Sequence, residues 1–337
     1  MAAIIKVENI SKEFRIKEKE PGLKGSLKSL FTSKYKSIDA VDNISFNVNK
    51  GEVVGFIGPN GAGKSTTIKM MTGILFPSSG KINVINYDPQ KERKKLAFKV
   101  GTVFGQKPQL WYHLPAIDTF NLFAKIYEIP EKQYQQRLKE LIKTFEVEEV
   151  INQPVRKLSL GQRMRCEMIA SLLHNPEVLF LDEPTIGMDI VAKKRIRELI
   201  KNLNENDGVT VILTSHDLED VEQVCKRLII INNGKIVYDG STKGIREKYL
   251  NFKIIQVILN EKTESLNLGL KNVKAVFKGK FRHVIEIDTS KHPIQEVVKK
   301  IVSKYNVEDI NILDPPIEEI ISRIYQNKTD HKDQKWD

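Results

Sequence analysis

The sequence contains few cysteines and no long apolar run. Its 337 residues include two cysteines, Cys166 and Cys225, which are too few for a disulfide framework and match no zinc-site spacing, so we expect both thiols to be reduced. The longest apolar runs have about four residues, whereas a membrane-spanning helix needs about 20. The N-terminus shows no basic segment followed by a long apolar stretch. The sequence therefore predicts a cytoplasmic protein without a membrane span or a secretion signal.

The composition is that of an ordinary globular protein. Apolar residues make up 40% and charged residues 29% of the chain, which excludes a disordered or collagen-like polymer. The 54 basic and 43 acidic residues give a net charge of +11. This charge favours anionic partners such as nucleotides, nucleic acid or the inner membrane leaflet, but it suits a solvated basic surface equally well. The length allows one large domain or two.

The pattern of apolar residues divides the chain into two parts. The first 250 residues alternate strand-like and helix-like segments, such as Val100–Phe104 and Glu131–Phe145, which is typical of an α/β domain with a mixed or parallel sheet. Residues 252–326 predict a small α+β domain, and residues 327–337 predict a disordered tail. The elements expected in the second part are strands at Phe252–Leu259, Val273–Phe277, Phe281–Asp288 and Ile310–Leu313 and helices at Pro293–Tyr305 and Pro316–Tyr325.

Residues 16–37 form an insertion between the first two expected strands. Four apolar residues recur at helical spacing, with lysines interleaved: Leu23, Leu27, Leu30 and Phe31, and Lys24, Lys28, Lys34 and Lys36. The pattern predicts a short basic amphipathic helix over residues 21–36. Such a helix would lie against a membrane or a partner, or pack on its own domain.

Residues 58–66 match the phosphate-binding motif G-x-x-x-x-G-K-[ST]. The motif follows the apolar segment Val53–Ile57 and opens an expected helix, which is the context that it requires. Successive backbone N–H groups at a glycine-rich helix N-terminus can bind the β- and γ-phosphates, while the lysine supplies a positive charge and the serine hydroxyl a ligand for Mg²⁺. We therefore predict nucleotide contacts from Gly58, Pro59, Asn60, Gly61, Ala62, Gly63, Lys64, Ser65 and Thr66.

Two carboxylates follow the apolar strand predicted at Val178–Leu181. Asp182 would stand at the carboxyl end of that strand, where ligands bind in open α/β sheets, and there it would hold Mg²⁺. The next residue, Glu183, could polarise an attacking water. Together with the phosphate-binding loop, these residues predict a Mg²⁺-dependent nucleoside triphosphatase, and the family resemblance given below implies that its nucleotide is ATP.

Between these two motifs lies Leu158-Ser159-Leu160-Gly161-Gln162, which resembles the LSGGQ signature of ABC-type ATPases. The order of motifs over residues 3–245 resembles that family throughout: phosphate loop, Gln106 after a strand, signature, Asp182-Glu183, Gly187-Met188-Asp189 and Thr214-Ser215-His216. The resemblance implies the ABC type of the P-loop NTPase fold, α/β with a mixed sheet core and a helical subdomain, over residues 1–245. The small α+β domain would follow.

The family resemblance also implies roles for individual residues. Phe14 resembles the aromatic residue that stacks on adenine, with Tyr35 as a weaker candidate. Gln106 resembles a Mg²⁺ contact, and His216 resembles the catalytic histidine that contacts the γ-phosphate. The signature residues that would bind nucleotide are Ser159, Gly161 and Gln162.

The signature motif departs from the family at two places. Leu160 replaces the first signature glycine, and we expect it to pack against the following helix without abolishing the site. The segment Gly187-Met188-Asp189-Ile190 differs from the usual GLDP by a Leu-to-Met change, which conserves volume, and by the loss of the proline.

Family members act as head-to-tail dimers, so one chain with one copy of each motif requires a second copy or a paralogue. The insertion, the run from Leu110 to Pro115 and the C-terminal domain resemble ATPase subunits of ABC-2 type exporters, whose membrane subunits are separate chains. The resemblance implies a transport subunit at the inner face of the membrane, without a nucleic-acid partner. Trp111 and Tyr112 would then line the groove for a membrane subunit, although Trp111 also suits a core position. The alternative is a non-transport ABC ATPase, either a mechanical membrane complex or a soluble translation or DNA-repair protein.

Overall fold

The computed structural model describes residues 3–17, 35–105, 107–215, 218–249, 252–270 and 273–314. The chain divides into two compact units, Met1–Gly240 and Ser241–Asp337. The boundary lies five residues before the predicted one at 245, so that α9 (Thr242–Tyr249) belongs to the second unit.

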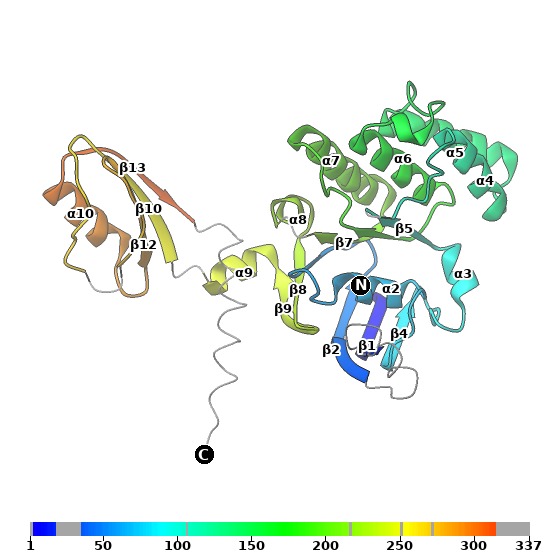
Figure 1. Ribbon diagram of the computed structural model, residues 1–337, viewed down its shortest axis with the longest axis horizontal. Coiled ribbons are helices and arrows are strands. Elements are labelled where there is room, and N and C mark those ends of the chain that lie inside the picture. Colours follow the sequence, from blue (N-terminus) through cyan, green and yellow to red (C-terminus); the bar gives the residue numbers. More distant parts are fainter. Residues whose placement is uncertain are drawn as a thin grey trace, which may run out of the picture. The chain divides into compact units, whose positions relative to one another are not determined.

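The first unit is built on a six-stranded sheet with the order β5-β6-β7-β3-β8-β9 (Figure 1). The strands are β3 (Val53–Ile57), β5 (Val100–Phe104), β6 (Val178–Asp182), β7 (Thr210–Ser215), β8 (Arg227–Asn232) and β9 (Lys235–Ser241). Neighbours from β5 to β8 pair in parallel. Because both faces of such a sheet are covered, its central strands contain continuous buried apolar runs, Val178–Leu181 in β6 and Val211–Leu213 in β7.

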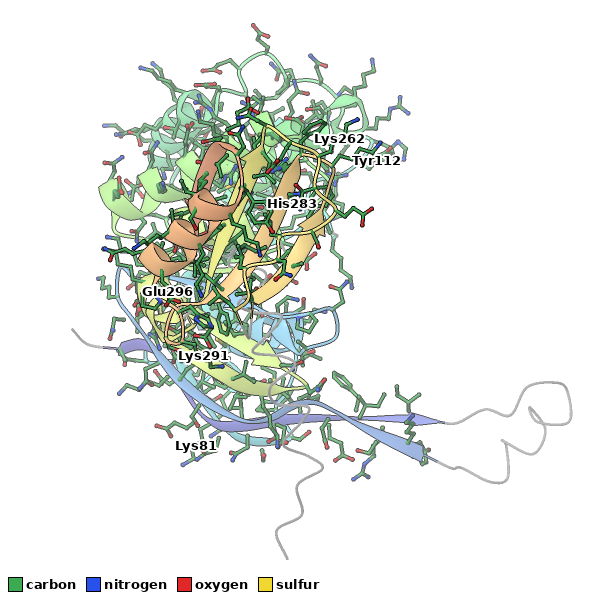
Figure 2. The ribbon with its side chains drawn as sticks, turned by 90° about the vertical axis from the view of Figure 1, so that its left-hand side faces the viewer. Lys81, Tyr112, Lys262, His283, Lys291 and Glu296 are labelled. Atoms are coloured by element: carbon green, nitrogen blue, oxygen red, sulfur yellow. The ribbon has the colours of Figure 1, made fainter. Side chains whose placement is uncertain are left out.

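A three-stranded antiparallel sheet completes the core of this unit. β1 (Ala3–Lys17) pairs with β2 (Tyr35–Asn49) and with β4 (Ser79–Val84), and β1 and β2 form a long ribbon (Figure 2). Apolar side chains from both sheets and from α2 (Lys64–Met71) share one core cluster, in which the rings of Phe46 and Phe56 lie 5.5 Å apart.

The helix predicted over residues 21–36 is wrong at its C-terminal end, and the insertion is shorter than the predicted 16–37 at both ends. Ile16 and Lys17 continue β1, and residues 35–37 open β2, where they pair with residues 15–17 across the ribbon. Extended pairing therefore prevails over the helical spacing there. Residues 18–34, which carry the apolar stripe and most of its lysines, lie outside the described residues.

The helices of the first unit include a group inserted between β5 and β6. These are α4 (Ala116–Ile126), α5 (Glu131–Phe145) and α6 (Leu160–Leu172), with the short 3-10 helix η1 (Val155–Lys157) before α6; α6 packs against both α4 and α5. They form the predicted helical subdomain. The other helices are α3 (Arg93–Ala97), α7 (Ile190–Asp207) and α8 (Leu218–Val224).

The second unit contains a four-stranded antiparallel sheet with the order β11-β12-β10-β13. Its strands are β10 (Phe252–Leu259), β11 (Val273–Lys278), β12 (Arg282–Asp288) and β13 (Val307–Leu313). Helix α10 (Ile294–Lys304) lies across one face (Figure 2), where Val297 and Ile301 pack on Ile255 and Ile285. The helix predicted at Pro316–Tyr325 and the predicted tail lie outside the described residues.

Candidate active site

The phosphate-binding loop joins β3 to the N-terminus of α2. Gly61 and Gly63 have φ angles of 79° and 109°, which side chains other than glycine rarely adopt. A Cβ atom at Gly58 would lie 2.4 Å from the Ile231 carbonyl oxygen, and one at Gly63 would lie 2.4 Å from that of Ala40. The loop therefore requires glycine at these positions, and it leaves the N-terminus of α2 without a side-chain cap, ready to bind an anion.

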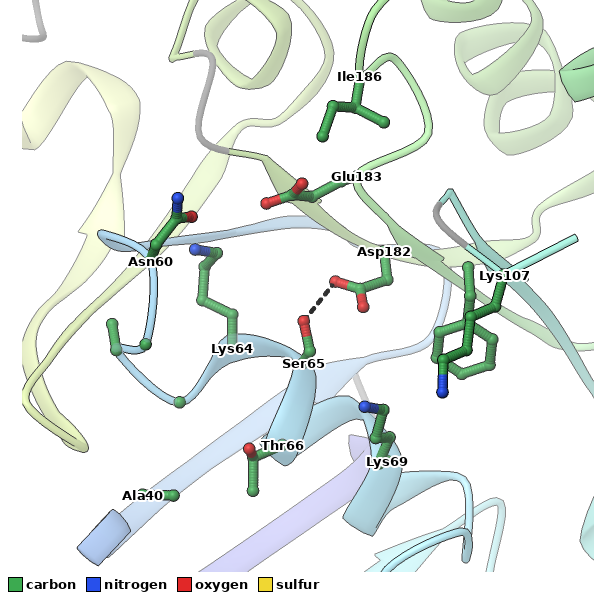
Figure 3. Close-up of a pocket in the computed structure, with 14 residues that line it drawn as sticks. Ala40, Asn60, Lys64, Ser65, Thr66, Lys69, Lys107, Asp182, Glu183 and Ile186 are labelled. Carbon is green, nitrogen blue, oxygen red and sulfur yellow. Dashed lines mark hydrogen bonds between the residues drawn. The ribbon is translucent and has the colours of Figure 1, made fainter. Parts of the chain in front are cut away.

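A cavity of about 540 Å³ lies over this loop (Figure 3). Three strands (β2, β5 and β6), α2 and the adjoining loops bring three lysines and two carboxylates to its wall. The lining residues are Ala40, Asn60–Thr66, Lys69, Phe104, Lys107, Asp182, Glu183 and Ile186. The positive charge and the free helix N-terminus suit a polyphosphate, and the carboxylates suit a divalent cation.

Lys64 is the most buried charged group of the cavity, with 5% of its surface exposed. Its ammonium group donates hydrogen bonds to the carbonyl oxygens of Gly58 (2.6 Å) and Pro59 (3.2 Å). Burial lowers the pKa of Lys64, while the charges of Glu183 and Asp182 oppose that shift. The carboxylates therefore help to keep a buried ammonium group charged.

A chain of hydrogen bonds connects the loop with the ends of β6 and β7. The Ser65 hydroxyl donates to Asp182 Oδ1 at 3.0 Å (Figure 3). The Thr214 hydroxyl donates to the same oxygen at 2.6 Å and accepts the Glu183 backbone N–H at 3.1 Å. The parallel register that sets Asp182 opposite Thr214 makes this arrangement possible. Thr214 thus holds both carboxylate residues, a role that its sequence motif did not reveal.

Glu183 occupies a turn directly after β6. Its φ angle of 55° lies in the left-handed region, which is unusual for glutamate and occurs often at functional sites. Gly105 approaches the same turn closely: its N–H donates to the Asp182 carbonyl oxygen at 2.9 Å, and a Cβ there would lie 2.3 Å from the Glu183 carbonyl oxygen. The loop after β5 therefore starts beside the two carboxylates. Gln106, the next residue, and His216 lie outside the described residues.

Phe14 is not among the residues that line the cavity. It pairs with Ile38 across the ribbon, two positions from Ala40 of the lining, and Lys12 Nζ lies 5.4 Å from its ring centroid. Tyr35 pairs with Lys17 further along the same ribbon. The assignment of an adenine contact to either residue stays a prediction.

The signature residues begin α6. The Ser159 hydroxyl accepts the Gln162 N–H at 3.2 Å, and the Gln162 side chain accepts the Ser159 N–H at 2.9 Å, which forms a capping box. Ser159, Gly161 and Gln162 line a second cavity of about 640 Å³ together with Arg165 and Asp189, and share none of the residues that line the first.

Leu160 packs against the loop before α7. A Cβ atom at Gly187, whose φ is 71°, would lie 3.2 Å from Leu160 Cδ2. Gly161 is equally close to α7, because a Cβ there would lie 3.0 Å from that of Ala192. Leu160, which departs from the signature, thus fills space beside the turn at Gly187. The sequence had predicted packing on the following helix and not this contact.

Comparison with known proteins agrees with this geometry. Residues 41–186 match the ABC transporter family. The linearmycin resistance ATP-binding protein LnrL of Bacillus subtilis is 33% identical over 86% of this chain and 93% of the relative. The chain belongs to the ABC transporter ATP-binding proteins. The bacitracin transport ATP-binding protein BcrA of Bacillus licheniformis is 34% identical over 66% of this chain and 72% of the relative.

A solved ABC cassette has the same fold. A dimeric cassette bound to ADP and Pi has a TM-score of 0.58 and 26% identity, over 70% of this chain and 98% of that chain. The predicted ABC fold, the resemblance to ABC-2 type exporter ATPases and the activity, ATP hydrolysis coupled to transport, are thereby confirmed. The ABC ATPase binds ATP, and its family works with transmembrane subunits and dimerises. The non-transport alternative is not favoured.

Proposed function

We propose that this ABC ATPase powers an exporter as one half of a head-to-tail pair. The observation that carries the proposal is the separation of complementary half-sites within one chain. The phosphate loop and the two carboxylates line one cavity, whereas the signature residues line another. A second ATPase chain in the opposite orientation would bring its signature to the phosphate loop of the first and complete both sites.

We infer that Mg²⁺ accompanies the nucleotide. Ser65 Oγ and Asp182 Oδ1 lie 3.0 Å apart on the cavity wall, and a hydroxyl with a carboxylate is an oxygen donor set that suits this ion. Gln106 is the further ligand expected from the sequence. Held by these residues, the ion would supply positive charge beside the phosphates of the nucleotide.

The residues of the chain divide the remaining work. The N–H groups at the start of α2 and the Lys64 ammonium bind and orient the phosphates. Glu183 accepts a hydrogen bond from the attacking water and polarises it. Thr214 fixes the turn that presents this glutamate, because its hydroxyl and its carbonyl oxygen each accept the Glu183 N–H at 3.1 Å. His216 would contact the γ-phosphate.

The start of α7 supports contact with a second chain. Ile190 and Val191 are 81% and 79% exposed, and Val191 belongs to the wall of the signature cavity. Two adjacent apolar side chains at such exposure favour an interface. We therefore assign this region to the contact between the two ATPase subunits, either two copies of this chain or this chain and a paralogue.

The membrane partner would meet the coupling loop, our name for residues 109–114. Trp111 and Tyr112 are 48% and 54% exposed, and Leu114 is also exposed, so a core position for Trp111 is wrong. Exposed aromatic side chains are enriched at protein contacts. No helix in the described part of the chain is long and apolar enough to span a membrane. We propose separate transmembrane subunits and a peripheral position at the inner face of the membrane.

The names of two relatives support a proposal for the direction of transport and the class of cargo. LnrL is named for linearmycin resistance and BcrA for bacitracin transport. A transport ATPase can give resistance by driving an antibiotic out of the cell, and we propose outward transport of antibiotic-like compounds by the complete complex.

Affinity capture tests this function. The tagged full-length chain, isolated from detergent-solubilised membranes of its own cells, should retain one or two multi-helix membrane proteins and hydrolyse ATP in their presence. Deletion of those membrane proteins should sensitise the cells to an antibiotic. Recovery of ribosomes or DNA without any membrane protein would contradict the proposal and restore the soluble alternative.

A further inference from the structure

The coupling loop is held in place by its backbone. The Trp111 N–H donates to the Thr119 hydroxyl of α4 at 3.3 Å, and the carbonyl oxygens of Tyr112 and Leu114 accept N–H groups from the region of η1. These contacts leave the side chains of Trp111, Tyr112 and Leu114 exposed. The loop is thus a fixed platform with an apolar surface.

A buried carboxylate on α6 accepts hydrogen bonds from two backbone N–H groups of this loop. Glu167 is 3% exposed. Its oxygens accept the N–H of Gln109 at 3.1 and 3.0 Å and the N–H of Leu110 at 3.3 Å. Burial raises the pKa of Glu167, and these two N–H groups oppose the shift. Burying a carboxylate is costly unless it is hydrogen-bonded, and its neighbours Cys166 and Met168 are apolar, so packing alone does not require an acid there.

Glu167 and the signature residues lie on the same helix, α6. The helix begins with the signature, where Ser159 and Gln162 form the capping box, and Glu167 follows within about two further turns. One rigid helix therefore carries at its N-terminus the residues that would meet the γ-phosphate and, on its buried side, the acceptor for the coupling loop.

We propose that Glu167 is a positioning residue that ties the coupling loop to the signature helix, so that the loop follows α6 when ATP closes the dimer. The inference rests on the proposed function, because it concerns the loop assigned to the membrane partner. Its test, however, uses the full-length ATPase without the membrane subunits, and it requires only that ATP bind and that two ATPase chains pair, with the paralogue added where the chain does not pair with itself.

Trp111 provides the readout. The chain contains two tryptophans, so Trp336→Phe leaves Trp111 as the single tryptophan, and excitation at a wavelength that tyrosine does not absorb selects its emission. Glu183→Gln in the same chain keeps ATP from being consumed. Emission and acrylamide quenching of Trp111 are then recorded with and without Mg-ATP, while labelled ATP measures binding and amide hydrogen exchange reports on Gln109 and Leu110.

Two substitutions at Glu167 separate its hydrogen bonds from its volume. Glu167→Gln keeps the shape but leaves one acceptor oxygen, and Glu167→Met fills a similar volume with no strong acceptor. Thr119→Val is the matched control, because it removes the other side-chain acceptor of the loop, which comes from α4.

We expect ATP to change the Trp111 signal in the parent chain and in Thr119→Val. The change should be reduced in Glu167→Gln and lost in Glu167→Met, while ATP binding persists. Exchange at the two amides should rise by about tenfold or more in Glu167→Met, since hydrogen bonds to a charged acceptor are among the stronger ones.

Several results would overturn the inference. The first is an absent Trp111 response in a parent chain that binds ATP and forms the ATP-bound dimer. The others are an equal response in both Glu167 variants and the parent, and an equal loss of response in Thr119→Val. If Glu167→Met fails to fold, Glu167→Gln decides alone. Failure of the parent chain to bind ATP would instead contradict the proposed function.

Discussion

Thr214 gives the two carboxylates after β6 a common anchor. One hydroxyl donates to Asp182 and accepts the backbone N–H of Glu183, so the proposed metal ligand and the proposed water-polarising residue are held by the same atom. The left-handed turn at Glu183 is held by this neighbour and by the close approach of Gly105. Removal of the Glu183 charge alone should therefore affect the reaction more than the geometry of the site.

Glu183→Gln tests that separation. The variant should bind ATP as the parent does and accumulate an ATP-bound dimer, because the amide preserves the size of the side chain. Its turnover should fall by roughly 10²–10⁴-fold, the range for a positioned general base. Hydrolysis measured with the membrane partner present, and binding measured by filter assay, distinguish the two effects. Near-normal turnover would show that another group polarises the water.

His174 predicts a pH dependence of stability far from the nucleotide. Its ring stacks on Tyr127 at 4.0 Å, Nε2 lies 3.0 Å from the Val100 carbonyl oxygen, and burial lowers the pKa of His174 from 6.5 to about 4. The unfolded chain therefore binds a proton more readily than the folded chain. The contribution of neutral His174 is complete above pH 6.5 and is lost as the pH falls towards 4, by about 1.4 kcal/mol per pH unit.

The variant His174→Gln should remove this dependence. Its free energy of unfolding should be lower than that of the parent at pH 7.5, because the ring stack is lost, and the difference should shrink as the pH falls to 4.5. Urea unfolding at a series of pH values measures both chains. A difference that stays constant with pH would contradict the burial argument.

At the scale of elements, the contact between the start of α6 and the turn before α7 is where the chain departs from the family signature. Leu160 replaces a glycine, and its side chain lies beside Gly187. If backbone groups of Ser159 and Gly161 recognise phosphate, the leucine contributes packing and little chemistry. A smaller residue at position 160 should leave a gap beside Gly187, and a larger residue at position 187 should crowd Leu160.

A double-mutant cycle tests this packing. Leu160→Gly should lower the melting temperature and leave ATP hydrolysis within about a few-fold, because a tenfold change corresponds to about 1.4 kcal/mol in the barrier. Gly187→Ala should destabilise through both its positive φ and the crowding by Leu160. In the double variant the crowding part should be recovered. A rate that rises more than about tenfold in Leu160→Gly would mean that the leucine restrains the site.

Helices and strands whose apolar pattern matches their burial were predictable from the sequence. β5, α5 and β10 have the expected bounds, because their periodicity is set by one buried face or by full burial. β1 and β2 are longer than the strands expected at Ile4–Val7 and Ile44–Val48, because their outer ends are exposed and pair with each other without the alternating burial that marks a strand in the sequence. α3 and α9 were missed because each is short and rich in charged residues.

The site residues were predictable where they belong to a motif of fixed spacing along the chain. The phosphate loop, Asp182 and Glu183 meet in one cavity, as expected from a strand–loop–helix motif and from a strand end in the same sheet. Thr214 and Glu167 were not identified, because their roles depend on the register of β6 with β7 and on the packing of α6 against a distant loop. Such contacts between segments far apart in sequence have no local signal.

At the scale of the whole molecule, the main question is whether the second half of each site comes from an identical chain. A homodimer would hold two equal composite sites, each with the phosphate loop of one copy and the signature of the other. Each site can then be inactivated from either side. Lys64→Ala removes the positive charge that binds phosphate from the phosphate loop. Ser159→Asp adds a negative charge to the signature while it preserves a good N-cap for α6.

Mixing these two variants tests the homodimer. Each variant alone should be inactive, because both of its sites carry the lesion. A heterodimer holds one site with both lesions and one intact site, made of the phosphate loop of the Ser159→Asp chain and the signature of the Lys64→Ala chain. An equal mixture should therefore recover up to about a quarter of the parent ATPase rate if the sites act independently, since about half of the dimers are mixed. Two different affinity tags verify that mixed dimers form. Mixed dimers without any activity would contradict independent sites, and an absence of mixed dimers would assign the second half to a paralogue.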